Sequence, residues 1–204
     1  MDFDAALRES VRVHGHLCAG QVLGIRMTML GLKEIGILHP KGADRKNLIV
    51  FVEMDRCATD AIQAVTGCSL GKRSMKFMDY GKMAATFLNV KTGKAMRVIA
   101  RENSRQKAKE LFPDIESKYV GQLEAYRIMT DEELFDLMEV TINVAPQDMP
   151  GRPLRRVPCD CCGEHVQDMR EIYQGGKILC VACAQGCYYE ERKTLLMRRF
   201  AKKA

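Results

Sequence analysis

The sequence predicts one core domain of helices around a mixed or antiparallel sheet, followed by a small zinc-binding domain. Helical spacing dominates the first 36 residues, strand and hairpin patterns follow between residues 47 and 100, and two Cys-x-x-Cys pairs stand near the C-terminus. With 204 residues and 47% hydrophobic content, the chain can bury one sizeable core and still carry a small appended module.

The first part of the chain is expected to form two helices. Apolar residues recur at helical spacing, and two aspartates stand where a helix N-terminus favours negative charge, so a helix is predicted over residues 3–13. The segment HGHLCAGQ interrupts the pattern, which then resumes and ends near Gly36. Gly20 and Gly24 fall on one face of this second helix, where another backbone can approach closely.

Strand patterns follow. The apolar, β-branched run at residues 47–54 predicts a buried strand, and a third helix is expected over residues 59–66, stopped by Gly67. Residues 84–90 and 95–100 flank the sequence KTGK, which is typical of a hairpin between antiparallel strands.

The rest of the core is less regular. Residues 103–111 predict a mainly charged helix, and Thr130 with Glu133 forms a capping box for a helix through Leu137. Residues 139–145 alternate well enough to predict another strand.

A proline-rich segment then marks a domain boundary. Four prolines and one glycine crowd into residues 146–158, which permits neither a helix nor an inner strand. We therefore predict a core domain over residues 1–150 and a zinc-finger domain over residues 151–204.

Composition limits the class of protein. No apolar run approaches the roughly 20 residues that span a bilayer, and the N-terminus opens with acids, so we expect a cytoplasmic protein without a membrane partner. Nine cysteines in a reducing compartment favour metal ligands or reactive thiols. Residues 151–204 carry 11 Lys+Arg against 6 Asp+Glu, so most of the net charge of +6 belongs to them. Four thiolates on one zinc ion would lower that local excess by two, which weakens the case for a polyanion partner.

The C-terminal cysteines predict a structural zinc site. Two Cys-x-x-Cys turns, separated by 17 residues, can surround one zinc ion with four thiolates at about 2.3 Å. An iron–sulfur cluster and cysteine pairs without a metal are alternatives, and Cys161 or Cys187 could substitute as a ligand. The spacing and a short hairpin through residues 173–177 resemble a treble clef, and so few apolar residues imply folding that depends on the metal. The predicted ligands are Cys159, Cys162, Cys180 and Cys183.

A second group of ligand-type residues lies near the N-terminus. His14, His16 and Cys18 alternate just before the second helix, and Cys57 stands between a strand and the third helix. A helix N-terminus stabilises a thiolate, so both thiols are candidate nucleophiles or soft metal ligands. We predict a catalytic cleft of Cys18, His14 and His16 with Cys57 and Asp60, and a candidate second metal site of His16, Cys18 and Cys57. Alternatively, the thiols are small core residues and the histidines cap the first helix.

Other charged residues have weaker assignments. Glu53 and Asp55, like Asp60, could orient a histidine or act as a base, although a solvated carboxylate is the simpler interpretation. A basic segment with Lys72, Arg73 and Lys76 could bind an anionic group or be merely solvated.

Three motifs, HGHLCAGQVLGIRM, DRCATDAIQAVTGCSLGKRSM and DYGKMAATF, make the chain similar to the formylmethanofuran dehydrogenase E-subunit family, including members with a C-terminal zinc finger. The family pattern has proline where this chain has Ala19. The resemblance implies an α+β core that forms intertwined homodimers, an appended treble-clef finger, and a shared cleft at His14, His16, Cys18 and Cys57. The family name comes from an association with a molybdenum or tungsten enzyme of methanogenesis, which implies such an enzyme as protein partner.

Three functions stay open. The first is an accessory or metal- or cofactor-handling protein linked to molybdenum or tungsten enzyme chemistry, with a transition metal in the cleft. The second is a zinc-finger interaction or regulatory protein whose basic tail, RKTLLMRRFAKKA, meets nucleic acid or an acidic protein, although 6% aromatic content and no tryptophan count against nucleic acid. The third is a thiol- or metal-dependent enzyme with Cys18 as nucleophile and His14 or His16 as base.

Overall fold

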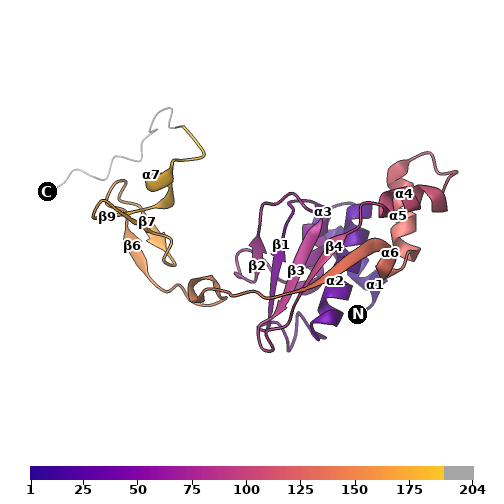
Figure 1. The fold of residues 1–204 in the computed structure, drawn as a ribbon, viewed down its shortest axis with the longest axis horizontal. Helices are drawn as coiled ribbons and strands as arrows, with labels where there is room; N and C mark the ends of the chain where they lie inside the picture. Colours follow the sequence, from indigo (N-terminus) through magenta and orange to yellow (C-terminus); the bar gives the residue numbers. More distant parts are fainter. Residues whose placement is uncertain (191–204) are drawn as a thin grey trace. The chain divides into compact units, whose positions relative to one another are not determined.

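The computed structural model describes residues 1–190 and divides the chain into two compact units, Met1–Gly151 and Arg152–Ala204 (Figure 1). The basic tail of the second hypothesis lies outside the described residues. Within residues 1–190, no helix combines the length and the apolar character that crossing a membrane requires.

Three helices follow the predicted pattern closely. The Asp2 carboxylate accepts hydrogen bonds from the backbone N–H groups of Asp4 and Ala5 and so caps the first helix. Gly15 and Gly67, both in the left-handed region at φ +92° and +70°, end the first and third helices. These helices are α1 (Phe3–His14), α2 (Ala19–Glu34) and α3 (Cys57–Thr66).

The core contains a five-stranded mixed sheet in the order β2-β1-β3-β4-β5. Strand β1 pairs with β2 in parallel and with β3 antiparallel, and the remaining neighbours are antiparallel. The predicted buried strand and hairpin are thereby confirmed, whereas β2 was not predicted. The strands are β1 (Leu48–Val52), β2 (Met75–Phe77), β3 (Ala84–Asn89), β4 (Ala95–Ala100) and β5 (Phe135–Val140).

The segment around the capping box differs from the prediction. Thr130 and Glu133 do form the box, but helix α6 covers only Asp131–Leu134 and the chain continues directly as β5. The predicted helix through Leu137 and the predicted strand over residues 139–145 were therefore wrong in their bounds. The physical reason is tertiary: all six residues of β5 pair with β4, which outweighs the local helix signal.

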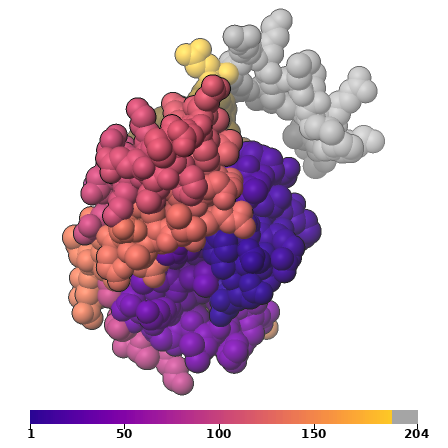
Figure 2. Space-filling model, turned by 90° about the vertical axis from the view of Figure 1, so that its right-hand side faces the viewer, coloured from indigo at the N-terminus to yellow at the C-terminus, as the bar shows by residue number. Residues whose placement is uncertain are grey.

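Two helices cover one end of the core. Helix α4 (Ser104–Leu111) was predicted, whereas α5 (Lys118–Ile128) was not, because its sequence lacks a clear apolar stripe. Figure 2 shows the N-terminal residues (indigo) beside the segment of α4, α5 and the following strand (pink to orange). Arg26 of α2 helps to join these parts, because it donates to the Tyr126 carbonyl and to Asp131 at 3.1 and 2.7 Å.

The main core lies between the sheet and helices α1–α3, which Figure 1 shows on one side of the strands. Phe87 of β3 is fully buried, and a Cβ atom at Gly31 of α2 would lie 2.2 Å from its ring. On the opposite sheet face, Ile49 packs with residues from the segment that follows β5, among them Ile142. One sheet thus has apolar residues on both faces.

Helices α2 and α3 approach each other closely, as the two glycines predicted. A Cβ atom at Gly24 would lie 2.7 Å from both Cα and the carbonyl oxygen of Ala58, and one at Gly20 would lie 3.0 Å from Cβ of Cys57. The missing side chains therefore allow the N-terminal ends of α2 and α3, where the two thiols stand, to lie next to each other.

Substitution Gly24→Ala tests this close approach. Alanine raises helix propensity by roughly 1 kcal/mol, but overpacking against backbone atoms that cannot rotate away costs about 1–3 kcal/mol. We expect a net loss in the free energy of unfolding, measured by urea denaturation. Gly71→Ala is the control, because no atom lies within 4 Å of its Cβ position. A Gly24→Ala variant as stable as the parent would show that the helices can separate freely.

The second unit has little apolar core. Within residues 152–190, Cys159 is the one buried residue. Its secondary structure consists of two short hairpins and a final one-turn helix: β6 (Arg156–Pro158) with β7 (His165–Gln167), β8 (Ile172–Gln174) with β9 (Lys177–Leu179), and α7 (Val181–Gln185).

Candidate functional site

Three helix ends bring a histidine and two cysteines together in the core unit. His14 is the last residue of α1, Cys18 is the N-cap of α2, and Cys57 is the first residue of α3. One ligand atom from each lies within 4.8 Å of the others, and all three residues are half-buried. The two thiols thus share one cleft with an imidazole.

A carboxylate fixes the orientation of the histidine. Nδ1 of His14 lies 2.7 Å from Oδ2 of Asp60, in the first turn of α3. Nε2 is buried and has no hydrogen-bond partner among residues 1–190. If Nδ1–H donates to the carboxylate, the lone pair of the neutral ring stands on Nε2, the nitrogen free to bind a metal.

The donor set fits a transition metal. Tetrahedral ligands at 2.0–2.3 Å from an ion lie about 3.3–3.8 Å apart, so a set within 4.8 Å would contract by about 1 Å on binding. Two thiolates and one imidazole suit zinc, copper(I) or iron rather than magnesium or calcium. Three protein ligands also leave a fourth position open for another molecule.

A buried polar chain, which the sequence analysis missed, supports the cleft. Gln21 of α2 donates from Nε2 to the carbonyl oxygen of Cys57 at 2.7 Å, and Ser10 of α1 bonds to its Oε1. Ser10 and Gln21 are fully buried. Their hydrogen bonds hold α1, α2 and α3 together beside the thiols. The sequence does contain a signal for this network, because Gln21 is a polar residue in an otherwise apolar part of α2.

Burial also affects the thiol of α3. Desolvation raises the pKa of Cys57 above its ordinary value, and the neighbouring Cys18 thiol adds to this rise. A cation between the two sulfur atoms would act in the opposite direction, because a metal stabilises the thiolate form.

His16 does not join the ligand group, although the predicted second metal site contained it in place of His14. Gly15 turns the chain out of α1 in the left-handed conformation, so that His16 is exposed and its ring centroid lies 4.5 Å from that of His14. Of the three carboxylates considered, only Asp60 contacts a histidine. Asp55 is exposed, and Glu53 is buried rather than solvated.

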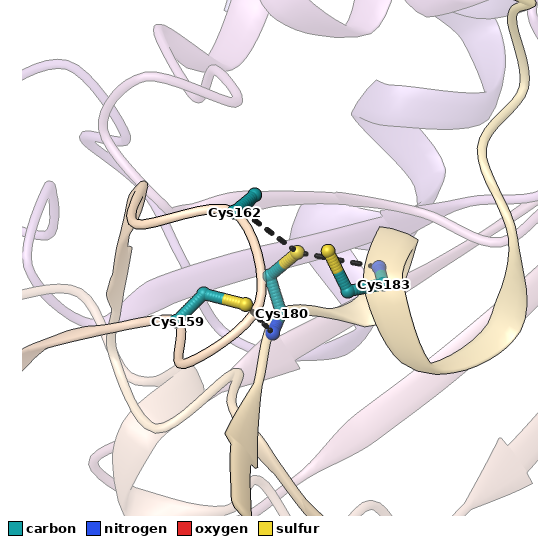
Figure 3. A group of neighbouring side chains, drawn as sticks. All are labelled: Cys159, Cys162, Cys180 and Cys183. Carbon is teal, nitrogen blue, oxygen red and sulfur yellow. Dashed lines mark hydrogen bonds between the residues drawn. The ribbon is translucent and has the colours of Figure 1, made fainter.

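The second unit brings the four predicted cysteine ligands together. Their sulfur atoms lie within 4.8 Å of one another, and Figure 3 shows the hydrogen bonds that link these residues. The backbone N–H of Cys180 donates to Sγ of Cys159 and that of Cys183 to Sγ of Cys180, both at 3.3 Å. Amides that donate to sulfur stabilise thiolates and orient them toward a metal.

Local turns create this arrangement. Cys159 follows β6, and Gly163, at φ +78°, donates its N–H to the Cys159 carbonyl oxygen at 2.9 Å and closes the first turn. Cys180 caps the N-terminus of α7. Cys161 and Cys187, the alternative ligands, are exposed and lie outside the group.

The charge state of these thiols favours a cation. Backbone N–H groups of Cys162 and Cys180 lower the pKa of Cys159 to about 6. The sulfur atoms of Cys180 and Cys162 raise the pKa of Cys183, because neighbouring thiols compete for negative charge. A divalent ion at the centre would offset this repulsion.

A family model matches more than half of this chain. The family model described as "FmdE, Molybdenum formylmethanofuran dehydrogenase operon" matches residues 13–143. A protein of Archaeoglobus fulgidus called "Probable S-adenosyl-L-methionine-binding protein" is 31% identical over 194 residues, which cover 86% of this chain and 51% of that protein. The chain thus spans about half the length of this curated relative.

A solved structure has the same fold. It is that of a protein from Syntrophus aciditrophicus, described as similar to FmdE of a tungsten formylmethanofuran dehydrogenase. It matches with a TM-score of 0.61 and 20% identity, over 93% of this chain and 96% of that chain.

Proposed function

This chain belongs to the FmdE family, and from that premise we propose that its core unit binds a transition-metal ion in an accessory, metal-handling role. His14, Cys18 and Cys57 are the proposed ligands, and Asp60 is a positioning residue. The family description mentions a molybdenum enzyme operon, and a link to such an enzyme is part of the proposal.

One observation carries the metal proposal. Nε2 of His14 is buried without a hydrogen-bond partner among the described residues, while Asp60 engages Nδ1 and two thiols converge on the same ring. An unpartnered buried nitrogen costs free energy, and a metal bond would offset that cost. The pairing of carboxylate and histidine is the arrangement that commonly orients metal-binding imidazoles.

An ion held by these three residues would have room for a further ligand, which suggests a role for the cleft. A half-buried site with three protein ligands can bind a ligand from another molecule or release its metal to one. Asp60 would hold the imidazole in its binding tautomer, and the glycines of α2 keep the two thiols adjacent.

Metal content tests this proposal. The full-length protein, purified without chelator, should contain two metal equivalents per chain by elemental mass spectrometry, and a Cys18→Ala, Cys57→Ala variant should contain one. Asp60→Asn should weaken binding of Co²⁺ to the core site by roughly 10–100-fold, measured by thiolate-to-cobalt absorption. Cys68→Ala, which removes a buried thiol outside the group, should keep both equivalents.

The same measurement can also contradict the proposal. One equivalent per chain in both the parent protein and the Cys18→Ala, Cys57→Ala variant would end the core metal proposal. Thermal unfolding of each variant would show that the loss of metal is not a loss of fold.

A thiol enzyme is the second candidate, and the bond between Asp60 and His14 favours it. In this arrangement Cys18 would be the nucleophile, His14 the base, and Asp60 the carboxylate that orients the base. Under this alternative Nε2 of His14 takes the proton of the Cys18 thiol. A core without metal in the experiment above would favour this alternative.

For the second unit we propose a structural zinc ion in a treble-clef finger. The turn with the first cysteine pair, the β8–β9 hairpin and the second pair at the start of α7 support this proposal. A homodimer and an enzyme partner remain predictions from the family resemblance, and edge strand β5, with Leu137 and Met138 exposed, is the surface we would assign to a second copy.

A further inference from the structure

A separate concave region of the core unit surrounds the C-terminal end of α3. Two adjoining cavities of about 440 and 480 Å³ share the walls formed by Arg45, residues 66–68 and Lys72. Each is within the size range of small-molecule sites. Neither includes a residue of the proposed metal site.

Positive charge dominates this region. Four basic side chains line the two cavities, and Glu9 is the carboxylate among the lining residues. Glu9 forms two hydrogen bonds of 2.9 and 3.0 Å with Arg12, which lower its pKa, and the Lys41 charge adds a smaller effect in the same direction. Within residues 1–190, none of the four cations lies in an ion pair. They are Lys41, Arg45, Lys46 and Lys72.

Two other cations of the basic segment, Arg73 and Lys76, stabilise the cavity wall through bonds to backbone carbonyl groups. Arg73 donates to the carbonyl oxygen of Gln147, and Lys76 donates to that of Asp148 at 2.5 Å. These bonds hold the segment before residues 149–151 against the core, and residues 149–151 line the larger cavity. In the basic segment, Arg73 and Lys76 therefore hold the cavity wall in place, whereas Lys72 lines the cavity itself.

The C-terminal end of α3 holds the Lys72 side chain beside the cavity. Its ammonium donates one hydrogen bond to the Gly67 carbonyl at 2.8 Å, which leaves two of its three donors. The carbonyl end of α3 itself disfavours an anion. The other three cations outweigh the partial negative charge of the helix end, because each carries a full positive charge.

We propose that these joined cavities bind a small anion with more than one negative charge, of the phosphorylated class. Four cations around one hollow, offset only in part by the Glu9 carboxylate, repel one another, and a multiply charged anion relieves that repulsion. Phosphoryl oxygens accept several hydrogen bonds, and the Arg45 guanidinium can engage two of them at once. The ligand would also contact residues 149–151, the last residues of the core unit.

Calorimetric titration of the full-length protein with inorganic pyrophosphate at low ionic strength tests the proposal. Saturable binding is expected, and Arg45→Gln with Lys46→Gln should weaken it by at least roughly ten-fold, because charged hydrogen bonds are lost. Lys91→Gln with Lys94→Gln is the matched control. It removes the same charge from the exposed β3–β4 turn and should change the affinity less than roughly two-fold.

Several results would overturn the proposal. These are no saturable binding by the parent protein, an equal loss of affinity in both double variants, or tighter binding to a short DNA duplex that both variants weaken equally. The equal losses would indicate general surface charge. Metal content should be unchanged in the Arg45→Gln, Lys46→Gln variant, so failure here and failure of the metal proposal are distinguishable.

Discussion

Chelation of metal from the full-length protein is expected to unfold residues 156–185 while the first unit stays folded. The second unit has one buried residue among those described, so burial of apolar surface cannot hold it together. Structural zinc contributes about 10–16 kcal/mol to comparable modules. Amide hydrogen exchange before and after chelation should show loss of protection confined to this unit.

Two neighbouring cysteines supply a matched control for this experiment. Cys162→Ser removes a ligand and should reproduce the effect of the chelator, whereas Cys161→Ser removes an exposed thiol outside the group and should leave protection unchanged. Retained protection of residues 156–185 in the chelated protein would contradict metal-dependent folding. Equal effects of the two substitutions would contradict the assignment of the ligands.

Arg97→Met is expected to lower the stability of the core unit by about 3–5 kcal/mol. Arg97 of β4 forms two hydrogen bonds of 2.7 and 2.8 Å with the Glu53 carboxylate, and the Glu53 side chain is only 7% exposed. The substitution leaves a buried charge without a partner, which is the costly case. For a domain of this size, the thermal midpoint should fall by roughly 10 °C, as measured by calorimetry.

An exposed ion pair between the end of β4 and strand β5 gives the comparison. Arg101 bonds to Asp136 with side chains 40% and 56% exposed, so Arg101→Met should cost less than about 1 kcal/mol. Replacing both Glu53 and Arg97 with apolar residues should recover much of the loss, because no unpaired charge remains. Similar losses for Arg97→Met and Arg101→Met would show that burial does not set the strength of the first pair.

Local sequence patterns predicted those elements whose stability is mainly local. Helix α1 has a capping aspartate, both α1 and α3 end at a glycine in the left-handed conformation, and the β3–β4 hairpin has its turn between two apolar runs. Strand β5 was misplaced because its partner β4 lies some 40 residues earlier in the chain, and that pairing overrode the capping-box signal. Helix α5 was missed because its apolar residues form no stripe.

The grouping of the four C-terminal cysteines, and the expectation that they bind a metal, follow from the sequence by itself, because Cys-x-x-Cys spacing positions each pair of sulfur atoms within one turn. The choice between His14 and His16 was decided only by the tertiary structure. The deciding bond joins His14 to Asp60, 46 residues apart, and depends on how α1 packs against α3. The same holds for the ion pair of Glu53, because its partner Arg97 lies 44 residues away, on β4.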